Sequence, residues 1–216
     1  MEKEEAVDPR LQNFSICQLS GNGHSGKSTL SLKIAKNRDK VYMEPHEKCI
    51  YFTLSPQSFT SETEDSDCDI LFVSDKDQLE AELLDSDSSL LVFDDFQLAA
   101  DSKDKLYVED YFIKRAHHDR ISCCFQTQLL LSKNSRNRNL TTHNFILFKS
   151  FHETQIKYFF RGLSTEKFPF LFDCYKYCTS KPYGYFVMDF HPKTQESVRY
   201  RDFVIPTEGS VVFVPK

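Results

Sequence analysis

The residues with the clearest chemistry form a glycine-rich run near the N-terminus that ends in a lysine and a serine. The run satisfies the pattern G-x-x-x-x-G-K-S/T, in which the backbone N–H groups of a tight loop point inward at nucleotide phosphates. Lys27 would reach the β- and γ-phosphates, and the Ser28 hydroxyl would bind Mg²⁺. An apolar strand pattern precedes the run and a helical pattern follows it, so the positive end of a helix would face the same anion. The predicted nucleotide-binding residues are Gly21, Asn22, Gly23, His24, Ser25, Gly26, Lys27, Ser28 and Thr29.

Two adjacent carboxylates follow an apolar run later in the chain. Residues 90–93 are typical of a buried strand, and Asp94 and Asp95 come directly after it. Ligands of open α/β sheets collect at the carboxyl ends of the strands, so both acids are expected there. We predict that Asp94 holds Mg²⁺, directly or through water, and that Asp95 polarises the attacking water. The alternative is that an Asp caps the following helix, but the phosphate loop earlier in the chain favours the metal site.

A third apolar segment, residues 121–125, leads into two glutamines. Gln128 could face the γ-phosphate or the attacking water, a positioning role that a glutamine fills without titrating. Gln126 would lie on the same face of an extended segment. The alternative for Gln128 is an ordinary turn residue.

A basic loop with two arginines, Arg136 and Arg138, comes next. One of them could insert into the site of a neighbouring subunit and neutralise charge in the transition state, a role that suits the fixed fork of a guanidinium. A solvated loop, or one that touches DNA phosphates, is the competing interpretation.

The elements that must position these residues alternate along the chain. Strand patterns are expected at 14–19, 49–54, 70–73, 90–93, 121–125 and 145–148, and helical patterns after the glycine-rich run and at 77–84, 105–118, 154–162 and 168–178. Such alternation predicts a mostly parallel sheet with helices on both faces. Segments 56–69 and 132–142 are expected to be loops, and the tail beyond residue 185 to contain β-structure. We predict a flexible leader over residues 1–12 and a single α/β domain over residues 13–216.

Composition sets limits on the class of protein. The chain has 216 residues, 40% hydrophobic and 27% charged, which suits one soluble domain. Its net charge of −5 argues against a protein that merely coats DNA, because phosphate neutralisation supplies most of such affinity. A ring-shaped motor with a few cationic groups in its pore stays possible. The first residues do not resemble a signal peptide, and no apolar run reaches the roughly 20 residues of a membrane span. The seven cysteines are therefore expected to be reduced intracellular thiols.

Taken in order, several segments resemble the packaging ATPases of the FtsK–HerA superfamily, especially those of Maverick/Polinton elements, adintoviruses and poxvirus-like large DNA viruses. The resemblance covers residues 14–216 and is carried by GNGHSGKST, LLVFDD, HHDRIS leading to FQTQ, Arg136 before HNFILFK, ETQIKYFFRG, and YGYFVMDFHPKT with the closing EG and PK. It implies a RecA-like (ASCE) P-loop NTPase core that uses ATP and Mg²⁺. It also implies a homo-oligomeric ring, a pentamer or hexamer, that drives double-stranded DNA into a preformed viral capsid through a portal-like vertex.

The resemblance also assigns roles to residues. Lys27 and Ser28 fall on the nucleotide and metal positions, Asp94 and Asp95 on the metal and base positions, and Gln128 on the γ-phosphate sensor. Arg136 matches the arginine after the sensor loop better than Arg138 does. The predicted catalytic residues are therefore Asp95, Gln128 and Arg136, and the predicted metal ligands are Ser28 and Asp94.

Two segments depart from the family pattern. Leu129-Leu130-Leu131 stands where the family often has Asn-Leu-Phe, and Phe151-His152-Glu153 stands where it often has Pro-Arg-Asp. No role is therefore carried over for the arginine of that second segment. Two other functions stay open at this stage: an ATP-dependent switch or assembly module with little turnover, and a P-loop kinase of small substrates. The expected location is inside a host cell, in the cytoplasm or nucleus where virions assemble.

Overall fold

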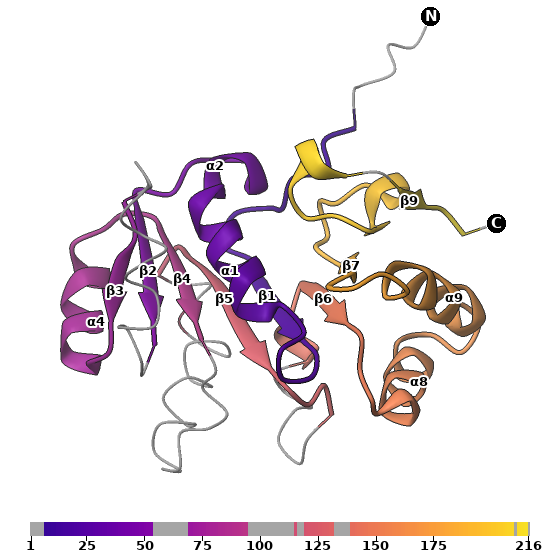
Figure 1. Cartoon of the computed structure of the whole chain (residues 1–216). Helices are drawn as coiled ribbons and strands as arrows, with labels where there is room; N and C mark the ends of the chain where they lie inside the picture. Colours follow the sequence, from indigo (N-terminus) through magenta and orange to yellow (C-terminus); the bar gives the residue numbers. More distant parts are fainter. Residues whose placement is uncertain are drawn as a thin grey trace, which may run out of the picture.

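One mixed sheet of nine strands organises the described part of the chain (Figure 1). The structure is a computed structural model, and it describes residues 7–53, 69–94, 115, 119–131, 139–209 and 211–215. The strand order is β3-β2-β4-β5-β1-β6-β7-β8-β9. Neighbouring strands from β3 to β6 are parallel, whereas β7, β8 and β9 continue the sheet in antiparallel pairs.

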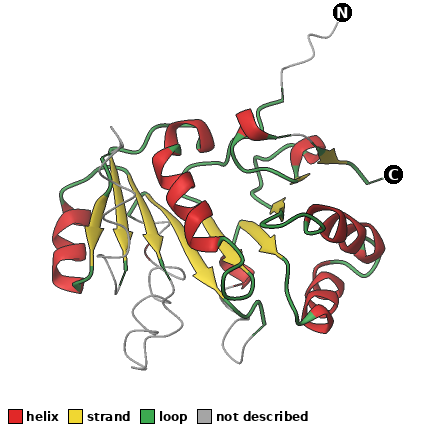
Figure 2. Ribbon diagram, in the orientation of Figure 1, coloured by secondary structure: helices red, strands yellow, loops and turns green. Residues whose placement is uncertain are grey.

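Figure 2 distinguishes the helices from the strands. The strands are β1 (Ile16–Ser20), β2 (Lys48–Phe52), β3 (Leu71–Val73), β4 (Ser89–Phe93), β5 (Ile121–Thr127), β6 (Asn144–Phe148), β7 (Tyr185–Asp189), β8 (Tyr200–Arg201) and β9 (Val212–Phe213). The helices of the described residues include α1 (Lys27–Lys36), α2 (Arg38–Val41), α4 (Lys76–Leu84), α8 (Glu153–Leu163) and α9 (Phe168–Cys178), with short 3₁₀ turns at Glu196–Val198 and Pro206–Glu208.

The central strands β1, β4 and β5 are buried along their whole length. Continuous apolar burial is typical of parallel strands that helices cover on both faces. The strands are in register near their ends, because Phe93 pairs with Phe125 and Ser20 pairs with Thr127. The segments that follow β4, β5 and β1 therefore meet at the same edge of the sheet.

Helices cover both faces of this sheet. Helix α1 packs with Ile34 on the face that carries Leu19 and Val92. Helix α4 packs with Leu79 against the opposite face, beside Leu91. Helices α8 and α9 form a further core with the side chains of β6 and β7, next to which they lie in Figure 1. In the described part of the chain, each helix is too short or too polar to cross a lipid bilayer.

The N-terminal segment joins the core before the expected domain boundary at residue 13. Leu11 is fully buried, its N–H donates to the carbonyl oxygen of Val41 at 2.7 Å, and its carbonyl accepts from the N–H of Met43 at 3.0 Å. A leucine that belongs to the main core is part of the domain, so Leu11 lies within the domain and not in a separate leader.

Most of the expected elements are confirmed, and the mostly parallel α/β sheet with flanking helices is confirmed as well. The polar segment expected to be a loop up to residue 142 is helical at 139–141, so that part of the prediction is wrong. The tail is not separate from the sheet, because β7, β8 and β9 extend it by antiparallel pairing. The loop expected at 56–69 and the helix expected at 105–118 lie outside the described residues, apart from Asp69 and Arg115.

Candidate nucleotide-binding site

The glycine-rich run connects β1 to α1, and two of its glycines are required by its shape. Gly26 has a φ of 99°, a left-handed conformation that side chains strain to adopt. A Cβ atom on Gly21 would lie 2.6 Å from the Cβ of Phe148, so a side chain would force the loop away from β6. The loop therefore closes tightly over the end of the sheet, as a phosphate-binding loop must.

Lys27 is the first residue of α1 and is largely buried. Its Nζ donates to the carbonyl oxygens of Gly21 at 3.0 Å and Asn22 at 2.7 Å. The ammonium group therefore lies against the backbone of the glycine-rich loop that precedes α1. Its positive charge and the amino end of α1 act on the same side of the loop, where an anion would be bound.

Ser28 and Asp94 are brought into direct contact from different parts of the chain. The Ser28 Oγ donates to the Asp94 Oδ1 at 2.9 Å, and Asp94 is only 8% exposed. Asp94 follows β4, whereas Ser28 is on α1. A serine hydroxyl beside a carboxylate is a set of oxygen donors that fits Mg²⁺, which commonly binds one or two such side chains together with phosphates and water.

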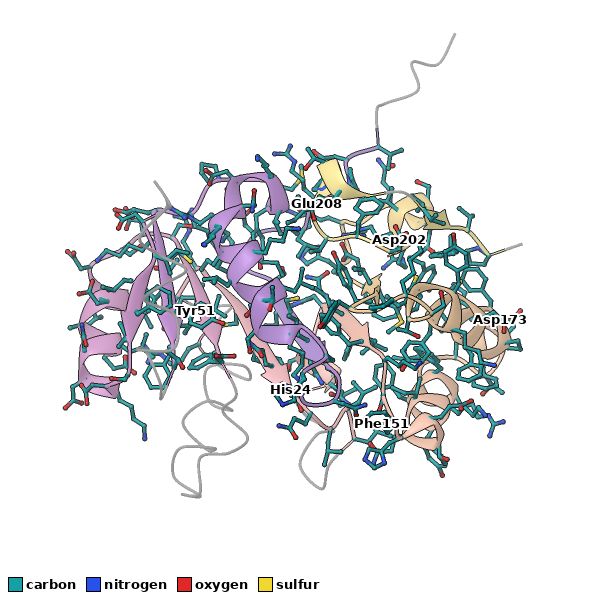
Figure 3. All side chains as sticks on the ribbon, in the orientation of Figure 1. His24, Tyr51, Phe151, Asp173, Asp202 and Glu208 are labelled. Carbon is teal, nitrogen blue, oxygen red and sulfur yellow. The ribbon has the colours of Figure 1, made fainter. Side chains whose placement is uncertain are left out.

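A hydrogen-bonded network behind Ser28 was not anticipated from the sequence. The Ser28 Oγ also lies 3.1 Å from the Oε1 of Gln126, whose Nε2 donates to the Ser31 Oγ at 2.8 Å. The Ser31 Oγ lies 2.8 Å from the phenol oxygen of Tyr51, which is on β2 and is labelled in Figure 3. Burial, with Asp94 nearby, raises the pKa of Tyr51, so its phenol stays neutral.

This network connects the metal-binding candidates to the core. Gln126 was expected on the same face as Gln128, but its contact with Ser28 was not. The only sequence signal for Ser31 is its spacing of three residues from Ser28, which places both on one side of a helix. Nothing local in the sequence indicates Tyr51.

Gln128 lies just beyond β5 and lines a cavity of about 510 Å³. The cavity is formed by loop and helix residues Gly23, His24, Ser25, Gly26, Lys27, Ser28 and Thr29, together with Gln126, Gln128 and Tyr183. The structure therefore gathers most of the predicted nucleotide-binding residues and the predicted sensor around one hollow. Asp95, Arg136 and Arg138 lie outside the described residues, so their predicted roles stay predictions.

The segments that depart from the family pattern also lie near this site. Leu130 is buried, and Thr127 Oγ1 donates to the carbonyl oxygen of Leu129 at 2.8 Å, which fixes the turn after β5. Phe151, which is labelled in Figure 3, is 85% exposed. Its N–H donates to the Asn22 Oδ1 at 3.4 Å. The segment that lacks the arginine of the family pattern is thus adjacent to the phosphate loop.

Together, the fold and this site define a class of protein. The chain has a P-loop NTPase fold of the RecA-like type: the phosphate loop follows β1, an acid follows β4, and β5 lies between these two strands in a mostly parallel sheet flanked by helices.

Comparison with known proteins supports this fold. The chain matches no known family profile and no curated protein sequence. It is similar in structure to the genome packaging NTPase B204 from Sulfolobus turreted icosahedral virus 2 in complex with ATP-gammaS, with a TM-score of 0.52 and 14% sequence identity over 87% of this chain and 96% of that chain. The same protein in complex with AMPPCP gives a TM-score of 0.52 and 16% identity over 82% of this chain and 93% of that one. B204 from Sulfolobus Turreted Icosahedral Virus, described as a DNA-packaging ATPase, gives 0.51 and 16% identity over 82% of this chain and 93% of that one.

Proposed function

We propose that this chain is an Mg²⁺-dependent ATPase that moves double-stranded DNA into a viral-type capsid. The observation that carries the ATPase proposal is the contact between the Ser28 Oγ and the Asp94 Oδ1, at the start of the helix that follows the phosphate-binding loop. The packaging role is supported by the sequence resemblance and by the shared fold of B204, a genome packaging NTPase.

The residues of the site would divide the work as follows. The loop N–H groups and Lys27 would bind the phosphates of ATP. Ser28 and Asp94 would hold Mg²⁺, which would supply charge neutralisation on the phosphate oxygens. Gln128 would orient the attacking water, and Asp95 would accept its proton. Of these groups, Gln128 is half-buried and lines the cavity, which suits a residue that meets both solvent water and the terminal phosphate.

The proposal includes assembly into a homo-oligomeric ring of five or six subunits at a capsid or portal-like vertex, inside the host cell. Arg136 of one subunit would then reach the nucleotide of its neighbour. The net charge of −5 fits a motor that touches DNA through a few residues better than it fits a protein that coats DNA.

The test is ATP hydrolysis by purified protein with and without duplex DNA, together with the mass of the assembled species. We expect phosphate release that rises with duplex DNA in a sample that contains rings. Two other functions predict different results. A small-substrate kinase would yield a phosphorylated product, and a switch would bind ATP tightly with negligible turnover.

Asp95→Asn tests the chemistry. We expect it to bind Mg·ATP like the wild type and to lose at least 100-fold in turnover, because general-base catalysis contributes roughly 10²–10⁴-fold. Asp77→Asn, at an exposed position of α4, is the matched control and should keep full activity. Equal turnover in the two variants would remove Asp95 from the mechanism.

Mixing variants tests the shared site. Arg136→Ala and Lys27→Ala subunits are each expected to be inactive alone and to recover part of the activity when mixed, since each would supply what the other lacks. Arg138→Ala is the control for the basic loop. If Arg136→Ala lowers the activity of monomers as much as that of rings, Arg136 does not act on the site of a neighbouring subunit.

A further inference from the structure

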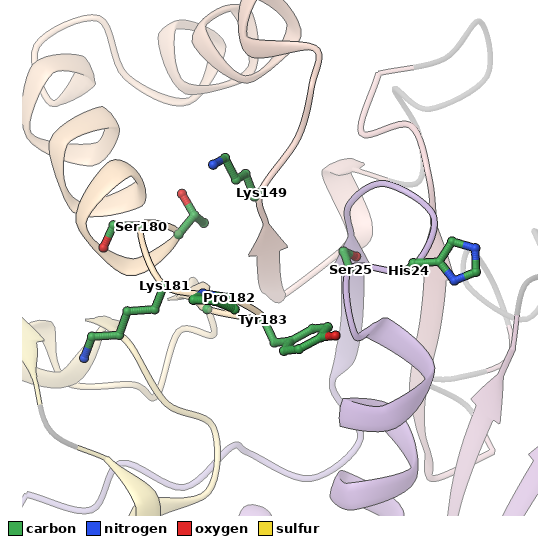
Figure 4. A pocket seen from close by; sticks show the side chains of 9 residues that line it. His24, Ser25, Lys149, Ser180, Lys181, Pro182 and Tyr183 are labelled. Carbon is green, nitrogen blue, oxygen red and sulfur yellow. The ribbon is translucent and has the colours of Figure 1, made fainter.

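A second cavity lies beside the phosphate loop, on the side away from Asp94. It has a volume of about 270 Å³ and is shown in Figure 4. Its walls are the loop residues His24 and Ser25, Lys149 directly after β6, and the segment 179–184 between α9 and β7. It shares His24, Ser25 and Tyr183 with the larger cavity over the phosphate loop. The two hollows therefore adjoin at Tyr183.

The order of the strands indicates which end of a bound nucleotide would lie on which side of the phosphate loop. Strands β4 and β5, which are followed by Asp94 and Gln128, lie on one side of β1, whereas β6 and β7 lie on the other. The terminal phosphate must reach the side of Asp94 and Gln128 for water to attack it. The nucleoside end of the molecule is then directed past the loop, toward the side that carries Tyr183 and Lys149.

Tyr183 presents an aromatic ring at this position. Its side chain reaches from its own loop toward the start of α1 in Figure 4, and the ring lies so close to Gly26 that a Cβ atom there would be 3.2 Å from the Tyr183 Cδ1. Tyr183 is nevertheless 73% exposed. One part of the ring thus contacts the phosphate loop, and the rest is open to a ligand.

The loop that holds Tyr183 is fixed by its neighbours. Tyr183 has a φ of 59°, a conformation that is uncommon for an aromatic residue. The Gly184 N–H donates to the carbonyl oxygen of Lys181 at 3.1 Å, and a Cβ on Gly184 would lie 2.1 Å from the carbonyl oxygen of Cys178. Packing therefore keeps the ring at this place, although the backbone conformation is unfavourable.

The charge at the second cavity also suits a nucleotide. Its lining includes Lys149 and Lys181, and none of the described residues that line it carries a carboxylate. Ammonium groups beside an exposed aromatic ring are the combination by which proteins bind phosphate and stack bases without reading their sequence.

We propose that Tyr183 is the base-stacking residue of the nucleotide site, and that the nucleoside part of ATP lies on its open face beside Lys149. This inference rests on the proposed function, because it requires a triphosphate on the loop at residues 21–28. Stacking tolerates any base, since every base has a π-face. The site is therefore expected to bind ATP and GTP with similar affinity.

The experiment compares a ligand that has a base with one that lacks it. Calorimetric titrations measure the binding of AMPPCP and of inorganic tripolyphosphate, both with Mg²⁺, to the wild type and to Tyr183→Asn. Asparagine removes the ring and accepts the positive φ of this position. We expect Tyr183→Asn to bind AMPPCP about tenfold more weakly and tripolyphosphate as the wild type does.

Two further variants complete the test. Tyr183→Phe keeps the ring and should bind both ligands like the wild type. Tyr158→Ala removes a tyrosine of α8 that is equally exposed, at 73%, and should change neither affinity. Unchanged AMPPCP binding by Tyr183→Asn, or equal weakening for both ligands, would overturn the stacking role alone. Wild-type protein that binds neither ligand would overturn the proposed function and the inference with it.

Discussion

Replacing Gln126 by methionine tests whether the network behind Ser28 contributes to nucleotide binding. The Ser28 hydroxyl has one proton, and both the Asp94 Oδ1 at 2.9 Å and the Gln126 Oε1 at 3.1 Å can accept it. If Asp94 holds Mg²⁺ as proposed, Gln126 is the remaining acceptor of the Ser28 proton. The lone pairs of the Ser28 Oγ would then face the metal and the phosphates. Methionine has a similar length but cannot accept this hydrogen bond as an amide does.

The expected magnitude follows from one hydrogen bond. A typical intramolecular hydrogen bond contributes about 1 kcal/mol net, which corresponds to roughly a fivefold change in affinity. We therefore expect Gln126→Met to weaken binding of AMPPCP about fivefold in the presence of Mg²⁺ and to have little effect with EDTA. The loss of the Nε2 contact with the Ser31 Oγ is expected to reduce stability as well, because that hydroxyl is buried.

A double-mutant cycle separates the two effects. Affinities of the wild type, Gln126→Met, Ser28→Ala and the double variant are measured by calorimetry in Mg²⁺, and unfolding in urea checks that each protein is folded. If Gln126 acts through Ser28, Gln126→Met has no further effect on affinity once Ser28 is alanine. The same fivefold loss in both backgrounds, or an equal loss with EDTA, would refute a role in positioning Ser28.

Three further predictions concern binding and stability. Lys27→Ala should weaken Mg·AMPPCP binding at least 100-fold in a calorimetric titration, because it removes the buried ammonium group at the loop. Burial lowers the pKa of His46 to about 4 from its ordinary 6.5. Between these two pH values the imidazole is protonated in the unfolded chain and neutral in the folded chain. The contribution of His46 to the free energy of unfolding is fully present above pH 6.5 and should fall by about 2 kcal/mol at pH 5. His46→Gln should remove this part of the pH dependence in urea unfolding, and an unchanged pH profile would contradict the prediction. Asp189→Asn should destabilise the fold by about 3–5 kcal/mol, because it leaves Arg201, 3.5 Å away and fully buried, without its carboxylate; the exposed Asp173→Asn is the control in the same denaturation assay.

The sequence alone determined the parts of the site that are contiguous in the chain. A glycine-rich run between an apolar strand and a helix carries its own geometry, because the positive φ of Gly26 and the helix that starts at Lys27 are local properties. The strand that delivers Asp94 and the strand that leads to Gln128 were likewise visible from short apolar runs. Alternation of these runs with helical patterns was sufficient to predict a parallel α/β sheet.

Only the tertiary structure decided which of these segments meet. Ser28 and Asp94 are 66 positions apart, and Ser28 and Gln126 are 98 positions apart. Their contacts depend on β5 lying between β1 and β4, a pairing of distant strands that local spacing does not encode. The approach of Tyr183 to Gly26 arises in the same way, from the placement of β6 and β7 on the far side of β1. Local spacing sets the conformation of each segment, whereas non-local strand pairing sets its neighbours. The network behind Ser28 and the ring of Tyr183 therefore could not be read from the chain.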